Sequence, residues 1–441
     1  MGVKVCKFGG TSLADAGQIR KVEQIIKADA KRRYIVPSAP GKRNAKDPKV
    51  TDLLYLCHAH ASQQVPMDEV FGLLAQRYRQ IVADLGLKLD IDGPLAEVKQ
   101  RILDGASADY AASRGEYLCG LIMAELLDAT FVDPAELIFF NGEGALDLAR
   151  SKGAIAERLK NVKRAIVPGF YGSGHDGKIK TFSRGGSDVT GAVVAAAVGA
   201  EVYETWTDVP GVMAADPRIV DNPKTIDTIT YRELRELAYM GAKVLHDEAI
   251  FPVREAGIPV HVRSTNAPDA RGTHIVSESQ MPRSTGKIGN ITGIAGRKDF
   301  TVIALEKALM NSEIGFARRL LQALETHNVS FEHAPSGIDT MCVVIADSVL
   351  EGKLDKVLDD IRRYCQPDAL EVYPHMALIA TVGRGMSHIP GMAAKVFGAL
   401  AEAGVNIRMI DQGSSEINII VGVETADFEK AVQAIYRRLL G

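Results

Sequence analysis

Cysteine and long apolar runs are scarce in this chain of 441 residues. The five cysteines are Cys6, Cys57, Cys119, Cys342 and Cys365. They are scattered, odd in number and never spaced as C-x-x-C, which argues against a disulfide framework and a zinc site. The most apolar stretch, residues 190–203, is too short to cross a bilayer. The amino-terminal residues lack the basic segment and apolar run of a signal peptide. We therefore expect a soluble cytoplasmic protein with no membrane partner and no metal ligands of its own.

A surplus of positive charge is also absent. The 52 basic and 55 acidic side chains give a formal charge of −3, whereas a dedicated nucleic-acid-binding protein carries a basic surplus. We expect no nucleic acid partner, and an acidic ligand would have to be held by local clusters of lysine and arginine. Glycine, in contrast, is abundant: the chain has 41 glycines, about 9% against a usual value of about 7%.

Short β-branched runs alternate with longer amphipathic stretches up to about residue 275. We expect strands at residues 3–8, 33–37, 137–140, 165–168, 201–206 and 259–263. We expect helices at residues 231–239 and 248–256. Such alternation predicts an α/β domain, with a mainly parallel sheet covered by helices on both faces. We assign residues 1–275 to this domain and residues 276–290, which are polar and contain proline and glycine, to a linker.

An internal repeat follows the linker. Ala304, Gly315, Leu324 and Val329 fall on Ala380, Gly391, Leu400 and Val405 when one copy is laid on the other. Each copy has the pattern of a βαββαβ unit. The second copy ends in a helix at residues 427–440 and lacks its fourth strand. We expect residues 291–295 to supply that strand, so that unit one (300–374) is inserted into unit two (291–299 plus 375–441).

The segment Lys7-Phe8-Gly9-Gly10-Thr11-Ser12 follows the first expected strand and precedes a helix. Backbone N–H groups at a glycine-rich helix entrance bind anions, and a lysine at the strand end adds positive charge. The segment is therefore a candidate phosphate site; the alternative is a sharp turn with a solvated lysine. Residues 172–178 also have the spacing G-x-G-x-x-G. Because Ile179 stands where a P-loop needs a hydroxyl, we interpret them as a hairpin turn.

Residues 183–190 combine an arginine, two glycines, two hydroxyls and a carboxylate just before an alanine-rich helix. Arg184 offers a fork for a carboxylate, and Asp188 can meet an ammonium group, so both ends of an amino acid could be held here. The alternative is an ordinary helix cap formed by Ser187 or Asp188.

Three further segments carry polar or charged side chains. Thr207 and Asp208 follow an expected strand, at the edge where ligands of open α/β sheets bind. Arg218 and Lys243 add cations in two later loops. Each segment alone is more often a loop than a site, but so many cationic or glycine-rich segments in one α/β domain favour a shared anionic ligand.

Together these segments resemble the aspartate kinases of the amino-acid kinase family over almost the whole chain. The matching motifs stand in the family's order: Lys7 to Ser12, Arg184 to Asp188, Trp206 to Gly211, Asp216-Pro217-Arg218 and Gly241 to His246. The repeat looks like a pair of ACT domains. The resemblance implies a three-layer αβα kinase domain followed by two ferredoxin-like domains. It also implies ATP-dependent phosphorylation of the L-aspartate side chain to 4-phospho-L-aspartate, the first step of lysine, threonine and methionine synthesis.

The resemblance also implies roles for single residues. The catalytic residues would be Lys7 and Asp208. The nucleotide side would be formed by Lys7, Gly9, Gly10, Thr207, Asp208, Met213, Arg218 and Lys243. The aspartate side would be formed by Ser38, Thr51, Glu116, Phe170, Arg184, Ser187 and Asp188. Mg²⁺ would be held mainly by the ATP phosphates. Met213 departs from the tyrosine of many family members, and Asp247 from their proline, so nucleotide contacts should differ.

Regulation would depend on the first ACT repeat. An amino-acid effector would meet its strand-to-helix turn at Met310, Ser312, Ile314, Gly315 and Phe316. We hypothesise that lysine, alone or with threonine, inhibits by binding between these repeats in a homodimer or homotetramer. The length predicts a monofunctional enzyme without a homoserine dehydrogenase. The alternatives are a kinase for glutamate, acetylglutamate or carbamate, and a catalytically silent amino-acid sensor.

Overall fold

The computed structural model describes residues 2–183, 185–242, 245, 247–281, 291–384, 386, 389–413 and 417–441. The chain divides into two compact units. The first unit contains the described residues of Met1–Val212, Thr225–Leu234 and Val244–Pro282. The second unit contains those of Met213–Lys224, Arg235–Lys243 and Arg283–Gly441. Two segments that precede the expected linker therefore belong to the second unit.

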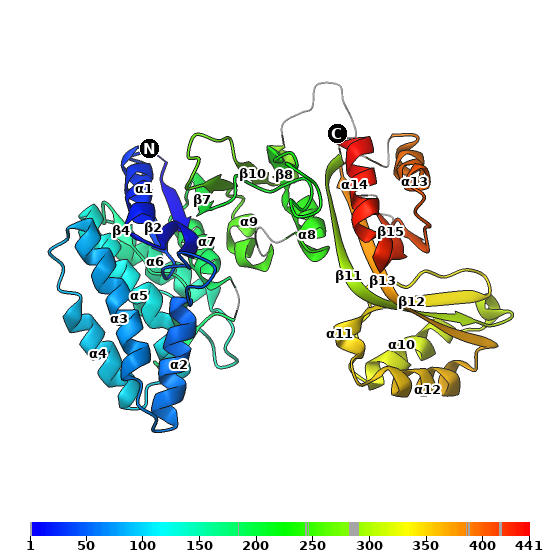
Figure 1. The fold of residues 1–441 in the computed structure, drawn as a ribbon, viewed down its shortest axis with the longest axis horizontal. Coiled ribbons are helices and arrows are strands. Elements are labelled where there is room, and N and C mark those ends of the chain that lie inside the picture. The colour runs from blue at the N-terminus through cyan, green and yellow to red at the C-terminus, as the bar shows by residue number, and fades with distance from the viewer. Residues whose placement is uncertain are drawn as a thin grey trace. The chain divides into compact units, whose positions relative to one another are not determined.

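An eight-stranded sheet is the centre of the first unit (Figure 1). Its strands are β1 (Lys4–Phe8), β2 (Arg32–Pro37), β3 (Thr130–Phe131), β4 (Ala165–Ile166), β7 (Val202–Thr207), β8 (Thr228–Thr230), β9 (Val260–Ser264) and β10 (Thr273–Val276). Their order is β3-β4-β2-β1-β7-β9-β10-β8. Only β9 and β10 are antiparallel neighbours. The predicted α/β fold with a mainly parallel sheet is confirmed.

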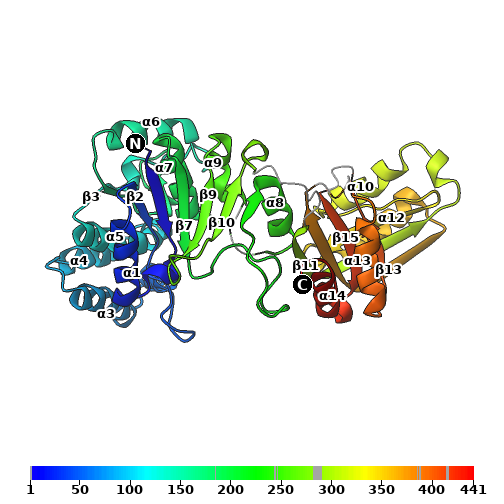
Figure 2. The ribbon, with the colours of Figure 1, turned by 90° about the horizontal axis from the view of Figure 1, so that it is seen from above.

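Helices cover both faces of this sheet. Figure 2 shows α6, α7 and α9 on one side and α1, α3, α4 and α5 on the other. The helices are α1 (Ala16–Lys27), α2 (Val50–Ser62), α3 (Asp68–Leu85), α4 (Asp92–Leu103), α5 (Ala108–Leu127), α6 (Leu148–Leu159), α7 (Gly186–Ala197) and α9 (Phe251–Glu255). Helix α8 (Tyr231–Tyr239) begins in the first unit and ends in the second. Capping fixes some of their starts, since the Asp15 side chain accepts the Gln18 N–H at 2.9 Å before α1.

Alternation along the strands separates two environments. Cys6, Phe8 and Trp206 point to one face and join the core formed with α1 to α5. Residues between them point to the opposite face, so Lys7 reaches toward α7, where its ammonium group meets Asp188. The same alternation therefore builds the core and presents a charged side chain to the other layer.

Two expectations for the first unit need correction. Residues 137–140 were expected to form a strand, but they make only isolated bridges, Phe139 with Ser173 and Phe140 with Leu146. They follow the 3₁₀ turn η2 (Pro134–Glu136) and lie against a hairpin formed by β5 (Tyr171–Ser173) and β6 (Ile179–Thr181). The antiparallel pairing of β5 with β6 confirms the hairpin turn predicted at residues 172–178.

The expected helix at residues 248–256 is divided into η3 (Asp247–Ile250) and α9. Pro252 lies in the first turn of α9. It has no N–H to continue a longer helix, which explains the break. The expected helix at residues 231–239 is found with the same bounds as α8.

A five-stranded antiparallel sheet is the centre of the second unit. Its strands are β11 (Ile291–Glu306), β12 (Thr340–Ala346), β13 (Ala369–Gly383), β14 (Met409–Asp411) and β15 (Asn418–Glu424), in the order β12-β11-β13-β15-β14. The long strands β11 and β13 pair along their whole lengths, with register shifts near Phe300. Asp299 (φ 70°) and His375 (φ 60°) adopt the left-handed region there, so the shared strands change course between the two repeats.

The helices of the second unit pack one apolar stripe on this sheet. They are α10 (Phe316–Thr326), α11 (Asp347–Leu350), α12 (Leu354–Cys365), α13 (Met392–Glu402) and α14 (Phe428–Leu439). Leu320 and Leu324 are buried in the first repeat, and Val396 and Leu400 are buried in the second, as their helical spacing predicts. Over the part of the chain that is described, no helix is both long and apolar enough to cross a bilayer.

Candidate active site

The carboxyl ends of β1, β2 and β7 bring three loops of the first unit together. The Ser38 N–H donates to the Phe8 carbonyl at 3.1 Å, and the Gly9 N–H donates to the Trp206 carbonyl at 3.0 Å. The chain also leaves β4 on this side, where the Gly169 N–H donates to the Pro37 carbonyl at 3.0 Å. This is the edge at which open α/β sheets bind ligands.

Lys7 and Asp188 form an ion pair at this edge. The Lys7 Nζ lies 2.8 Å from the Asp188 carboxylate, and both side chains are largely shielded from solvent. The Thr205 hydroxyl donates to the same carboxylate at 3.3 Å, and the Tyr203 hydroxyl donates to the Asp188 backbone carbonyl at 3.1 Å. The structure thus joins two residues that the sequence singled out separately. Thr205 holds the Asp188 carboxylate, and Tyr203 holds the Asp188 backbone.

The two glycines after β1 have different surroundings. A Cβ on Gly10 would lie 2.9 Å from the Ala39 carbonyl oxygen and 3.2 Å from Gly41, so only glycine fits between these loops. Gly9 was expected to offer its amide to a phosphate, but that N–H is already engaged by Trp206. The role predicted for Gly9 stays a prediction, and no partner for the Gly10 N–H is found within the described chain.

Glu116 on α5 is a buried carboxylate close to this edge. It is 5% exposed, and its Oε2 atom has no hydrogen-bond partner among the described residues. Burial raises the pKa of Glu116 to about 8, although the Ala39 N–H donates to the carboxylate. A cation that reached Oε2 would reverse this shift. Thr51 lies in the first turn of α2, which packs against α5.

The loop that contains Phe170 packs closely against the start of α7, which contains Ser187. Phe170 has a φ of 81°, a strained conformation for a residue with a Cβ. The Phe170 N–H donates to the Thr190 hydroxyl at 3.2 Å, which holds this conformation against α7. A Cβ on Gly169 would lie 2.5 Å from the Ser187 hydroxyl, so the loop and the start of α7 are in close contact.

The expected nucleotide residues are divided between the two units. Thr207 donates to the Asp208 carboxylate at 3.1 Å at the exposed end of β7. Met213 and Arg218 belong to the second unit, where the Arg218 Nε donates to Asp216 at 3.0 Å. Arg184 and Lys243 lie outside the described residues.

Sequence reasoning missed the charged group that fixes the loop after β2. Asp47 is buried and lies 2.8 Å from Arg43 and 3.2 Å from Arg77. Hydrogen bonds from Arg43, together with the charge of Arg77, hold the pKa of Asp47 well below its usual value. Arg77 also donates to the Gly41 carbonyl. Nothing in the sequence distinguishes Asp47 from its polar neighbours, because Arg77 is on a separate helix.

The predicted effector turn of the second unit contains both buried and exposed side chains. Met310 and Phe316 are buried in the hydrophobic core, whereas Ile314 is 98% exposed. Ser312 is also exposed, and Gly315 has a φ of 83° at the start of α10. Ligand contacts at this turn would therefore come from Ser312, Ile314 and the backbone, with Met310 and Phe316 as support.

Comparisons with known proteins agree with this architecture. A model of the amino acid kinase family matches residues 2–264, and an ACT domain model matches residues 379–439. Aspartokinase 3 of Bacillus subtilis is 39% identical over 99% of this chain and 98% of its own length. The crystal structure of Clostridium acetobutylicum aspartate kinase has 57% identity and a TM-score of 0.94, and the match covers 99% of this chain and 100% of that one.

Two crystal structures of Escherichia coli aspartokinase III are also similar, at 28% identity over 100% of both chains. Their TM-scores are 0.75 for the complex with aspartate and ADP and 0.72 for the complex with lysine and aspartate. The fold and the matched regions define a small-molecule kinase with an ACT region.

The chain belongs to the amino acid kinase family, and within it to the aspartokinases. It uses ATP to phosphorylate the side-chain carboxylate of L-aspartate to 4-phospho-L-aspartate, the first step of lysine, threonine and methionine biosynthesis, and its ACT region provides feedback regulation. The resemblance drawn from the sequence motifs is confirmed.

Proposed function

We propose that L-aspartate binds with its ammonium group between Glu116 and Asp188 and its α-carboxylate on Arg184. The observation that carries this proposal is the buried Oε2 of Glu116, which lacks a hydrogen-bond partner. An unpaired buried carboxylate is costly, and a substrate ammonium group would stabilise it. The remaining pocket residues would be Ser38, Thr51, Phe170 and Ser187.

ATP would lie on the side of Lys7 and Gly10, with its phosphates toward the Lys7 ammonium group and the Gly10 amide. The other nucleotide residues would be Thr207, Asp208, Met213, Arg218 and Lys243. A glycine-rich turn after a strand and a nearby lysine suit a polyphosphate. Mg²⁺ would be held mainly by the ATP phosphates and would neutralise part of their charge.

Binding of the two substrates would exchange the Lys7–Asp188 ion pair for new partners. The pair keeps both charges in place before substrates arrive. Lys7 would turn to the phosphates and Asp188 to the aspartate ammonium group. The attacking carboxylate, with an ordinary pKa near 3.9, is already ionised at pH 7, so no general base is needed. The residues act by positioning and by offsetting the repulsion between two anions.

Kinetics of two variants test these roles. Lys7→Ala should lower kcat by roughly a hundredfold or more, while Arg184→Ala should mainly raise the KM for aspartate. Lys27→Ala, which removes an exposed lysine paired with Glu23 on α1, is the matched control. Kinetics like those of the wild type in either site variant, measured by aspartate-dependent ADP release, would remove the role proposed for that residue.

We also propose the domain division stated above: residues 1–275 as catalytic domain, 276–290 as linker, 300–374 as ACT unit one, and 291–299 with 375–441 as ACT unit two. Support comes from β11, whose first part, Ile291 to Arg297, pairs with Gly383 to Leu378 of the second repeat. Its later part, Val302 to Glu306, pairs with Tyr373 to Ala369 of the first repeat.

Regulation would involve association of two or four copies through unit one, with lysine, alone or with threonine, as effector. Leu309, Ile314 and Ile338 are largely exposed apolar side chains on adjacent loops of that unit, and the Asn311 N–H donates to the Ile338 carbonyl between them. Exposed apolar groups of this kind mark association surfaces. Ile314→Glu should shift the oligomer toward monomer in sedimentation, and an unchanged assembly would contradict this surface.

We further assign the enzyme to the cytoplasm. All five cysteines are unpaired thiols, which suits a reducing compartment.

A further inference from the structure

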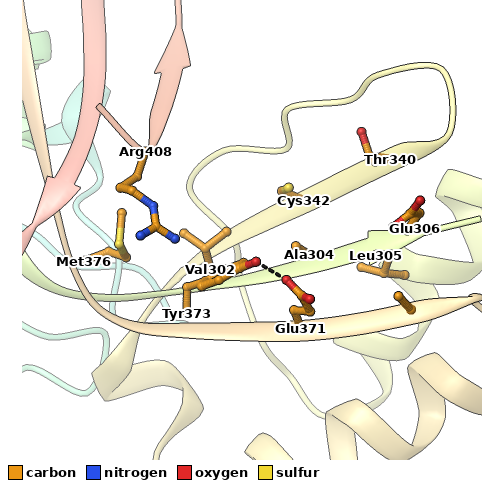
Figure 3. A pocket seen from close by; sticks show the side chains of 11 residues that line it. Val302, Ala304, Leu305, Glu306, Thr340, Cys342, Glu371, Tyr373, Met376 and Arg408 are labelled. Carbon is orange, nitrogen blue, oxygen red and sulfur yellow. Dashed lines mark hydrogen bonds between the residues drawn. The ribbon is translucent and has the colours of Figure 1, made fainter. Parts of the chain in front are cut away.

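An open cavity of about 370 Å³ lies on the sheet of the second unit. Ile303 and Val343 point to the face that packs against α10 and α12. Residues alternate along a strand, so Val302, Ala304 and Cys342, which line the cavity, belong to the opposite face (Figure 3).

Strand register explains why the sheet is hollow there. Ala304 on β11 stands opposite Cys342 on β12 and opposite Glu371 on β13. Two pairs further along, on the same face, Val302 stands opposite Tyr373. The small side chains of Ala304 and Cys342 form a low apolar floor, and the longer side chains of β13 form a wall beside it.

Polar groups of both signs surround the floor. Arg408 and Met376 lie at one end of the cavity, and Glu306 and Thr340 lie at the other (Figure 3). The Arg408 guanidinium lies 5.0 Å from the centroid of the Tyr373 ring, and the Tyr373 hydroxyl donates to Glu371. Arg408 also donates to Glu424 at 3.1 Å through Nη1. Because a guanidinium has five N–H donors, others remain for a carboxylate.

We propose that this cavity binds a small zwitterionic amino acid. Its carboxylate would meet Arg408, its ammonium group would meet Glu371, and its apolar side chain would cover Ala304 and Cys342. A cationic and an anionic anchor beside an apolar floor are complementary to that class of ligand and to neither an amine nor an acid alone. The cavity contains none of the predicted effector residues from Met310 to Phe316, so this binding site goes beyond the proposed function.

Cys342 gives a direct readout of occupancy. It is half-buried, whereas the other four cysteines are buried. Alkylation of the full-length protein by N-ethylmaleimide, followed by mass spectrometry, should therefore report on the cavity. At least one common L-amino acid should slow Cys342 alkylation saturably, by roughly tenfold at high occupancy. The matched analogues that lack one charge, isopentylamine and 4-methylpentanoate in the case of L-leucine, should give no protection.

Variants test the anchors and the floor. Arg408→Gln should raise the half-protecting concentration by roughly tenfold or more, and Ala304→Leu should abolish protection by filling the floor. Arg363→Gln on the exposed side of α12 removes a charge elsewhere in the unit and should change nothing. Arg408→Gln leaves the apolar floor of Ala304 and Cys342 unchanged, so it tests the proposal even if Ala304→Leu misfolds.

Three results would overturn the proposal. The first is unchanged alkylation with every common amino acid, and the second is equal protection by the single-charge analogues. The third is protection that depends on protein concentration without added ligand, which would assign this face to a second copy of the chain. Since the readout involves no phosphoryl transfer, failure of the proposed substrate roles would not affect it.

Discussion

Glu204 and Glu116, two of the buried glutamates of the first unit, have surroundings that are opposite in character. Glu204 on β7 is 1% exposed, and the Arg32 guanidinium donates to both its oxygens, at 2.8 and 3.2 Å. Burial alone would raise the pKa of Glu204, but the hydrogen bonds and charge of Arg32 outweigh it and lower that pKa. Glu116 on α5 is similarly buried but keeps one oxygen without a partner, and its pKa rises to about 8.

The surroundings of Glu204 contain more positive than negative charge. Lys4 and Arg263 each lie 3.6 Å from its carboxylate, in addition to Arg32. The Trp206 indole N–H donates to it at 3.0 Å, and the indole ring lies within 5.1 Å of the Arg32 and 4.5 Å of the Arg263 guanidinium carbon. The protein itself supplies every partner of Glu204. The difference indicates that Glu204 stabilises the fold, whereas Glu116 is left for a cation that comes from outside.

The largest effect should come from removing the charge that holds this cluster together. Glu204→Gln removes the anion that Arg32 and Arg263 share, while Lys4 keeps Asp29 at 3.0 Å. Because two shielded guanidinium groups lose their charged partner, we expect a loss of about 3–5 kcal/mol in the free energy of unfolding. Urea denaturation at pH 7 measures it. Glu201→Gln, which removes a solvent-exposed pair with Lys31, is the control and should cost about 0–1 kcal/mol. A loss below about 1 kcal/mol for Glu204→Gln would mean that the cluster is not structural.

A smaller effect, on substrate binding instead of stability, should follow from Glu116→Gln. The amide cannot form a charged contact with the aspartate ammonium group, so the KM for aspartate should rise by roughly tenfold to a hundredfold. Stability at pH 8 should not fall, because an unpaired buried carboxyl is removed. Glu125→Gln on the exposed side of α5 is the control. An unchanged KM would contradict the contrast between the two glutamates.

The sequence predicted the residues of the substrate site better than it predicted the buried charge cluster around Glu204. The motif around Lys7 and the segment before α7 were recognisable because carboxyl ends of parallel strands meet at one edge, and their residue types suit anions and ammonium groups. The pairing of Lys7 with Asp188 was not predictable, since it depends on how α7 packs on β1. Glu204 was overlooked because it is one acidic residue in a β-branched run, and Arg32 is 172 residues away along the chain.

The fold shows the same limits. Periodicity predicted α8 and the stripes of α10 and α13, because amphipathic spacing determines which face is buried. It failed at residues 137–140, where the apolar run lies against a hairpin instead of joining the main sheet. An apolar run of that length carries no information about the layer in which it is buried.

The smallest effect we expect is the release of a proton from Glu116 when aspartate binds. With a pKa of about 8, Glu116 is mostly protonated at pH 7 in the free enzyme. The aspartate ammonium group favours the ionised carboxylate, so binding should release up to about one proton. Below pH 8 that deprotonation opposes binding, and the affinity for aspartate should rise roughly tenfold per pH unit from pH 6 and level off above pH 8.

Calorimetry of aspartate binding in phosphate and in Tris separates proton release from the binding enthalpy, because the two buffers differ in ionisation enthalpy. Glu116→Gln should release no proton at this site and should lose the pH dependence, whereas Glu125→Gln should retain both. If wild-type binding enthalpies were equal in the two buffers, Glu116 would already be ionised before aspartate arrives. Its unpaired oxygen would then have a cation partner in solution, and the difference from Glu204 would disappear.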